Sequence, residues 1–226
     1  MNYLAHAIPF LDDPYFVAGT SVPDWLMVAD RGVRMRVKNV RPWAESRDPV
    51  VAAVAGGVLQ HLRDDGQFHQ TRAFVETNLE LTSAVQAALG GDRGLVPNVL
   101  GHLLVELLLD ATLAAEAPER LEAYYGALGQ VDFLRVEAVV SQIGTRPTVR
   151  LAQFAQFFFE ARILSDYAAD GKLMVRVNQV MRRLGLEPVD ESLAAIFPRA
   201  RQLVAERRHE LLEGIPVKEK TQCVTE

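Results

Sequence analysis

The sequence predicts an all-α protein folded as a single multi-helix bundle. Hydrophobic residues recur with the period of an α-helix along most of the 226 residues, and the alternation typical of β-strands is scarce. Helix starts are well marked, because Asp13–Pro14 and Asp48–Pro49 each place a capping residue before a proline at the first helical position. We expect one domain over residues 1–214, followed by a disordered tail over residues 215–226.

The N-terminal part is expected to hold short helices followed by a long one. Helix starts are predicted at four capping residues, which are Asn2, Asp13, Ser21 and Asp48. The third start would form a capping box, in which Ser21 and Asp24 each accept a hydrogen bond from the other's backbone amide. Residues 31–43 are interpreted as the end of one helix and an exposed connection.

The rest of the chain is divided by glycine and proline into further helical segments. The expected helices cover residues 71–89, 95–115, 118–128, 131–143, 148–168 and 190–212. Gly90–Gly91 ends the first of these, the run 144–147 separates the fourth from the fifth, and Gly214 with Pro216 stops the last. Gly171 is expected either to interrupt or to bend the segment that follows it.

Composition and charge narrow the class of protein. A formal net charge of −5 argues against nucleic-acid binding driven by the whole surface. The one cysteine, Cys223, excludes an intramolecular disulfide and a multi-thiolate metal site. The start MNYLAHAIPF lacks a basic region and a cleavage site, so we expect no signal peptide and a cytoplasmic location. Residues 95–115 are long enough to cross a membrane, but three ionisable groups and no basic flank favour a buried helix without a membrane span.

Two stretches place imidazoles and carboxylates at a four-residue spacing. The run GVLQHLRDDGQFH carries His61, Asp65 and His69, and the later run 96–115 repeats the spacing. The residues of the second set are His102, Glu106 and Asp110. A step of four residues drifts by only about 40° around an α-helix, so each set shares one face. Two such faces turned toward each other would form a site for two or three metal ions.

Each helix also allows a simpler interpretation. Residues 96–115 are apolar on most sides, so Glu106 must take up a proton, find a partner or bind a cation. Alternatively, His102 and Glu106 form an ordinary pair, with Asp110 at the solvent edge. The helix that carries His61 either ends near Gly66, where the helix dipole disfavours two acids in the last turn, or continues through this glycine at a cost of about 1 kcal/mol.

The remaining candidates differ in strength. Asp65 shares a face with both histidines and is preferred as a ligand, whereas Asp64 is expected to be solvated or to support a ligand. His6 is either a ligand or a core histidine, and Asp24 either a ligand or only a capping residue. A basic run would hold a phosphate or an acidic partner, or would simply form a solubilising loop; its residues are Arg31, Arg34, Arg36 and Lys38.

Four motifs resemble the bacterial acyl-carrier-protein phosphodiesterase family in order and approximate spacing. They are MNYLAH, GTSVPDW, VAGGVLQHLRDDGQFH and LVPNVLGHLLVELLLD, and the later run FFFEARILSDYAADGKLMVRVNQVMRRL is also similar. The resemblance implies an all-α, HD-domain-like fold and metal-dependent hydrolysis of a phosphodiester on acyl carrier protein. It also implies that His6, Asp24, His61 and Asp65 lie near the metal.

The chain departs from that family's pattern at two places. Leu62 stands where the family has arginine, and His102, Glu106 and Leu107 replace an Asp-x-x-x-Asp-His pattern. The His-x-x-x-Asp and His-x-x-x-Glu pairs look more like zinc-dependent phospholipase C and related nucleases. Both resemblances imply hydrolysis of a phosphoester.

Three hypotheses follow from the sequence. The first is an enzyme with Zn, Mn or Fe, in which Asp65 and Asp64 are the candidate catalytic carboxylates and Asp110 supports the ligands. Its candidate metal ligands are His6, Asp24, His61, Asp65, His69, His102 and Glu106. The second is a non-catalytic helical relative with a polar core. The third is an interaction module that binds a carrier protein through the basic run.

Overall fold

The computed structural model describes residues 1–91 and 93–215. All regular elements within these ranges are helical, which confirms the all-α class predicted from the sequence. The expected tail over residues 215–226 lies outside the described residues, apart from Ile215, which is buried.

The N-terminal part differs from the expectation at two places: no helix starts at Ser21, and residues 31–43, expected to be a helix end and an exposed connection, contain two short helices. Its elements are α1 (Tyr3–Ala7), η1 (Ile8–Phe10), α2 (Pro14–Ala29), α3 (Val37–Val40), η2 (Arg41–Trp43) and α4 (Pro49–Phe68). The predicted helix start at Ser21 is wrong, because α2 runs on through Pro23. The Ser21 hydroxyl donates to the carbonyl of Val17 and does not cap a helix. The buried apolar face of α2 continues past the proline with Trp25 and Leu26, so tertiary packing holds the helix together.

The later elements follow the expected order. They are α5 (Arg72–Leu89), α6 (Val96–Glu116), α7 (Pro118–Leu128), α8 (Phe133–Ile143), α9 (Leu151–Glu160), η3 (Ile163–Ala168), α10 (Asp170–Arg183), η4 (Glu191–Ile196) and α11 (Phe197–Leu211). The helix expected over residues 148–168 is divided at Arg162, whose φ of 44° is left-handed. The guanidinium of Arg162 lies 4.4 Å from the ring centre of Tyr125 and pairs with Glu122, so tertiary contacts accompany this break.

Helices α2 and α4 cross at a contact between their backbones. A Cβ atom on Gly57 would overlap the carbonyl oxygen of Phe16, and a Cβ atom on Gly19 would overlap the carbonyl oxygen of Val54. Only glycine allows this approach. Close to this contact, the Thr20 carbonyl and Asp24 of α2 lie beside His61 of α4.

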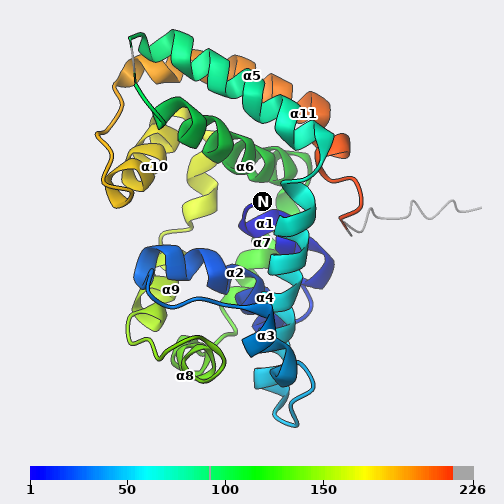
Figure 1. Ribbon diagram of the computed structural model, residues 1–226. Coiled ribbons are helices and arrows are strands. Elements are labelled where there is room, and N and C mark those ends of the chain that lie inside the picture. Colours follow the sequence, from blue (N-terminus) through cyan, green and yellow to red (C-terminus); the bar gives the residue numbers. More distant parts are fainter. Residues whose placement is uncertain (92, 216–226) are drawn as a thin grey trace, which may run out of the picture.

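Helix α1 lies in the middle of the molecule, between α6 and the α2–α4 pair (Figure 1). One cluster of buried hydrophobic side chains extends from Met1 to Ile215. Helix α6 is long and apolar enough to cross a membrane by length and composition, yet 56% of its most apolar window is buried here. It packs against α5 and α11, as expected of a core helix.

Candidate metal centre

A buried carboxylate fixes the short helix that carries His6. Asp110 on α6 accepts hydrogen bonds from the backbone amides of Leu4 and Ala5, both at 3.0 Å. The side chain of Asn2 makes no capping hydrogen bond, so Asp110 supplies the cap from another helix. Asp110 is 1% exposed, and burial raises its pKa to about 7. It therefore supports His6 through the backbone of α1, not by orienting an imidazole.

The first group of candidate ligands is His6, His61 and Asp65, whose ligand atoms all lie within 4.8 Å of one another. The His61 Nδ1–H donates to the Thr20 carbonyl at 2.8 Å, and the His6 Nδ1–H donates to Asp64 at 3.3 Å. Neutral imidazoles protonated at Nδ1 carry their lone pair on Nε2. The Nε2 of His6 is buried and has no hydrogen-bond partner among the described residues. Both rings thus present Nε2 as metal-binding histidines do.

Burial keeps these two imidazoles neutral. His6 is 0% exposed, and its pKa lies well below the usual value, mainly because burial disfavours the charged ring and secondly because His61 is close. The two rings stack with their centres 4.2 Å apart. Burial is also the main reason that the pKa of His61 is lowered. Neutral imidazole is the form that binds a metal ion.

Asp64 and Gln60 support this group from behind. Asp64 is buried, and the Gln60 amide donates to its second oxygen at 2.7 Å. Burial raises the pKa of Asp64 to about 6, against the opposing effect of Gln60. Of the two roles considered for Asp64, the structure places it behind His6 and not in solvent. Asp65, with 36% of its side chain exposed, faces the centre.

The second group is His69, His102 and Glu106, with ligand atoms again within 4.8 Å of one another. The Nε2 atoms of both histidines lie 3.1 Å from the same oxygen of Glu106. His102 is 43% exposed at its side chain, whereas Asp110 is deeply buried. The alternative that placed Asp110 at the solvent edge is therefore wrong: the polar face of α6 is exposed at His102 and buried at Asp110.

A positive charge links the two groups in this structure. The Met1 ammonium donates to Asp65 at 2.8 Å and to Glu106 at 2.9 Å. Burial by itself would lower the pKa of this amine, but Glu106 and Asp65 outweigh burial and raise it. Burial would likewise raise the pKa of Glu106, yet the Met1 ammonium, His102 and His69 hold it well below its usual range. The space between these carboxylates favours a cation.

Asp24 joins the centre from α2. Its Oδ1 lies 4.0 Å from the Nε2 of His61, and it caps no helix because α2 continues through it. Burial raises its pKa to about 8, and the neighbouring charge of Glu106 adds to the effect. A cation bound beside Asp24 would favour its ionised form.

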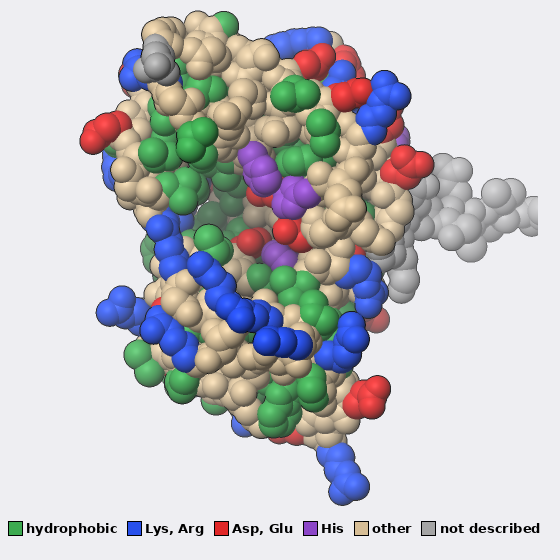
Figure 2. All heavy atoms as spheres, in the orientation of Figure 1, with side chains coloured by type: hydrophobic (Ala, Val, Ile, Leu, Met, Phe, Trp, Pro, Cys, Tyr) green, Lys and Arg blue, Asp and Glu red, His purple; other side chains and the backbone are tan. Residues whose placement is uncertain are grey.

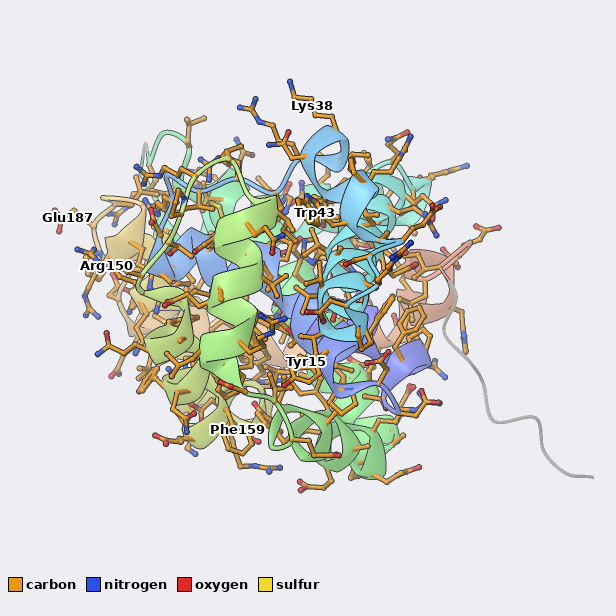
Figure 3. All side chains as sticks on the ribbon, turned by 90° about the horizontal axis from the view of Figure 1, so that it is seen from below. Tyr15, Lys38, Trp43, Arg150, Phe159 and Glu187 are labelled. Atoms are coloured by element: carbon orange, nitrogen blue, oxygen red, sulfur yellow. The ribbon has the colours of Figure 1, made fainter. Side chains whose placement is uncertain are left out.

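The side chains of the basic run lie on the surface. Arg34, Arg36 and Lys38 are exposed, and buried Val33 and Met35 alternate with the two arginines. Figure 2 shows histidines and carboxylates in a depression of the surface, with lysine and arginine side chains crossing the same face below it. Lys38 points away from the molecule in Figure 3. Arg31 alone of this run lines the cavity next to the centre.

The structure brings together all seven predicted ligands, from α1, α2, α4 and α6, with His69 just after α4. Sequence reasoning missed Gln60, although its spacing of four from Asp64 is a signal for such a pair. It also missed the Thr20 carbonyl and the Met1 amine. A backbone carbonyl and a terminal amine have no side-chain pattern that could have indicated them.

Comparison with known proteins finds no matching family model, no matching curated protein and no matching solved structure.

Proposed function

We propose that this protein is a metal-dependent phosphoester hydrolase. The observation that supports it best is the arrangement of His6 and His61. Each donates its Nδ1–H to a protein oxygen; the Nε2 of His61 lies 4.0 Å from Asp24, and the buried Nε2 of His6 has no hydrogen-bond partner among the described residues. A buried polar atom left unpaired costs about 1–3 kcal/mol, which a bound cation would remove.

The donor set fits one or two divalent ions. His6, His61 and Asp65 would hold one ion, and His69, His102 and Glu106 would hold another, with Asp24 beside His61. Mixed nitrogen and oxygen donors suit Zn, Mn or Fe. Such an ion would lower the pKa of water and neutralise charge that develops on phosphoryl oxygens.

The residues of the chain itself would position the substrate. Arg31 lines the cavity beside the centre, and Arg34 donates to the sulfur of Met27, another residue of the cavity wall. These cations favour an anionic substrate over a neutral ester. A carrier-protein partner and an HD-like ancestry remain predictions from the sequence resemblance, and a cytoplasmic location remains a prediction from the expected lack of a signal peptide.

The test combines metal content with turnover. Protein purified without chelator is expected to contain a divalent metal and to hydrolyse bis(4-nitrophenyl) phosphate, and His61→Ala is expected to lose both. His209→Ala is the matched control, because this histidine is exposed near the end of α11. Undiminished metal content and turnover in His61→Ala would contradict the proposal.

A second candidate is a non-catalytic helical protein with a metal-free polar core. It is favoured by the Met1 ammonium, which already pairs with Asp65 and Glu106. For this candidate, the same experiment is expected to find no bound metal and no turnover in the wild type.

A further inference from the structure

A cavity of about 200 Å³ opens directly beside the metal centre. Asp24 and Glu106 belong to both, and the remaining wall comes mainly from α1, α2, α6, α9, η3 and α10. Figure 2 shows a hollow next to the histidines in which hydrophobic side chains are visible. A ligand bound at the centre would therefore extend into this space.

The wall is mainly hydrophobic. Its apolar side chains include Met27, Leu103, Leu107, Phe154, Phe158 and Val180. An apolar cavity of about 150 Å³ in a protein can bind benzene. The present cavity is larger, so a six-carbon ring or chain fits it.

Three arginines line the same cavity, together with Asp24 and Glu106. Arg176 pairs with Asp166 at 2.6 Å. Arg183 is half-buried and makes neither a hydrogen bond nor an ion pair with a side chain in the described part of the chain. Arg31 donates to the carbonyl of Met27 and pairs with no carboxylate among the described residues. An unpaired, half-buried guanidinium is suited to an anionic oxygen.

We propose that this cavity binds the organic group of the substrate, and that the substrate is a phosphoester of a compact hydrophobic alcohol. Arg183 and Arg31 hold anionic oxygen of the same ligand, while the phenylalanine and leucine side chains contact its alkyl or aryl group. The assignment of the ligand as a substrate rests on the proposed function; the binding site does not.

The test uses alkyl phosphonates from methyl to hexyl, measured by calorimetry on metal-free and metal-loaded protein. Burial of each added methylene is expected to tighten binding by about fourfold until the cavity is full. Equal affinity for methyl- and hexylphosphonate in both forms would overturn the proposal.

Two pairs of variants on α10 locate the site. Val180→Trp fills the cavity and is expected to abolish the chain-length preference, whereas Val175→Trp, at an exposed position outside the cavity, is expected to keep it. Arg183→Gln is expected to weaken hexylphosphonate at least tenfold, and Arg182→Gln, an exposed neighbour outside the cavity, to leave it unchanged. Equal effects within either pair would place the ligand elsewhere.

The same series separates this inference from the catalytic one. If binding depends on chain length but no phosphodiester is hydrolysed, the binding site is supported and the hydrolase proposal is contradicted. If the methyl and hexyl esters of 4-nitrophenyl phosphate are hydrolysed equally fast, the hydrolase proposal is supported and the binding-site proposal is contradicted.

Discussion

At the scale of single residues, the centre depends on groups that hold the histidines from behind. Gln60 donates to Asp64, and Asp64 accepts from His6, so three buried side chains form a chain of hydrogen bonds. A ligating histidine is oriented and made more basic by such a partner. Because Asp64 accepts hydrogen bonds from both Gln60 and His6, this buried carboxylate of α4 does not lack partners.

We predict that Gln60→Met weakens metal binding about 10–100-fold, because Asp64 loses its donor and holds His6 less firmly. Competition with a chelating dye measures the affinity. Gln67→Met is the control, since Gln67 is exposed on the same helix. An unchanged affinity in Gln60→Met would show that this hydrogen-bond chain has no part in metal binding.

At the scale of elements, the centre exists because α2 and α4 touch. The close contact at Gly19 and Gly57 brings the Thr20 carbonyl within 2.8 Å of the His61 Nδ1. It also brings Asp24 to the same imidazole. Small residues on two helices thus set the distance between groups that lie about forty positions apart in the chain.

Gly57→Ala is expected to destabilise the fold by about 1–3 kcal/mol or more, because the new Cβ overlaps the backbone of α2. Gly66→Ala is expected to stabilise it by about 0.5–1 kcal/mol, since Gly66 lies inside the same helix with no atom near the added Cβ. Urea unfolding of the metal-free proteins measures both changes. Similar effects of the two substitutions would contradict the proposed helix contact.

Local patterns predicted most of the helices and several of their N-terminal ends. Asp13, Asp48 and Thr71 cap helices as local chemistry indicates, and the four-residue spacing placed the ligands of α4 and α6 on shared faces. The sequence failed at Ser21 and Arg162, where contacts with distant segments decide whether a helix continues. Local signals also could not indicate that α1 lies between α4 and α6, so that the two polar faces meet through His69, Glu106 and the Met1 ammonium.

At the scale of the whole molecule, the centre concentrates groups whose ionisation opposes folding. The pKa of Asp24 is raised to about 8 and that of Asp110 to about 7, so the folded protein binds these protons more tightly than the unfolded chain. Their contribution to stability therefore falls as the pH rises from about 4 to 8. His6 and His61 act oppositely, because their lowered pKa values reduce stability as the pH falls below about 6.5.

A bound divalent ion would reverse the first of these effects. Binding requires an ionised Asp24 and neutral histidines, and both conditions are met more fully as the pH rises toward 8. If one proton is displaced, the apparent affinity is expected to rise up to about tenfold per pH unit below pH 8. At saturating metal, each tenfold gain adds about 1.4 kcal/mol to the free energy of unfolding.

We therefore predict that a fixed free concentration of Mn²⁺ raises the Tm more at pH 8 than at pH 6. For a chain of this size, a gain of 1.4 kcal/mol corresponds to about 3–6 °C. Calorimetry with and without the ion measures the difference, and His61→Ala is expected to show no metal-dependent shift at either pH. A shift that is equal at the two pH values, or larger at pH 6, would mean that Asp24 is not among the groups that bind the ion. A shift that persists in His61→Ala would place the ion outside the centre, because His61 of α4 is the candidate ligand that contacts both Thr20 and Asp24 of α2.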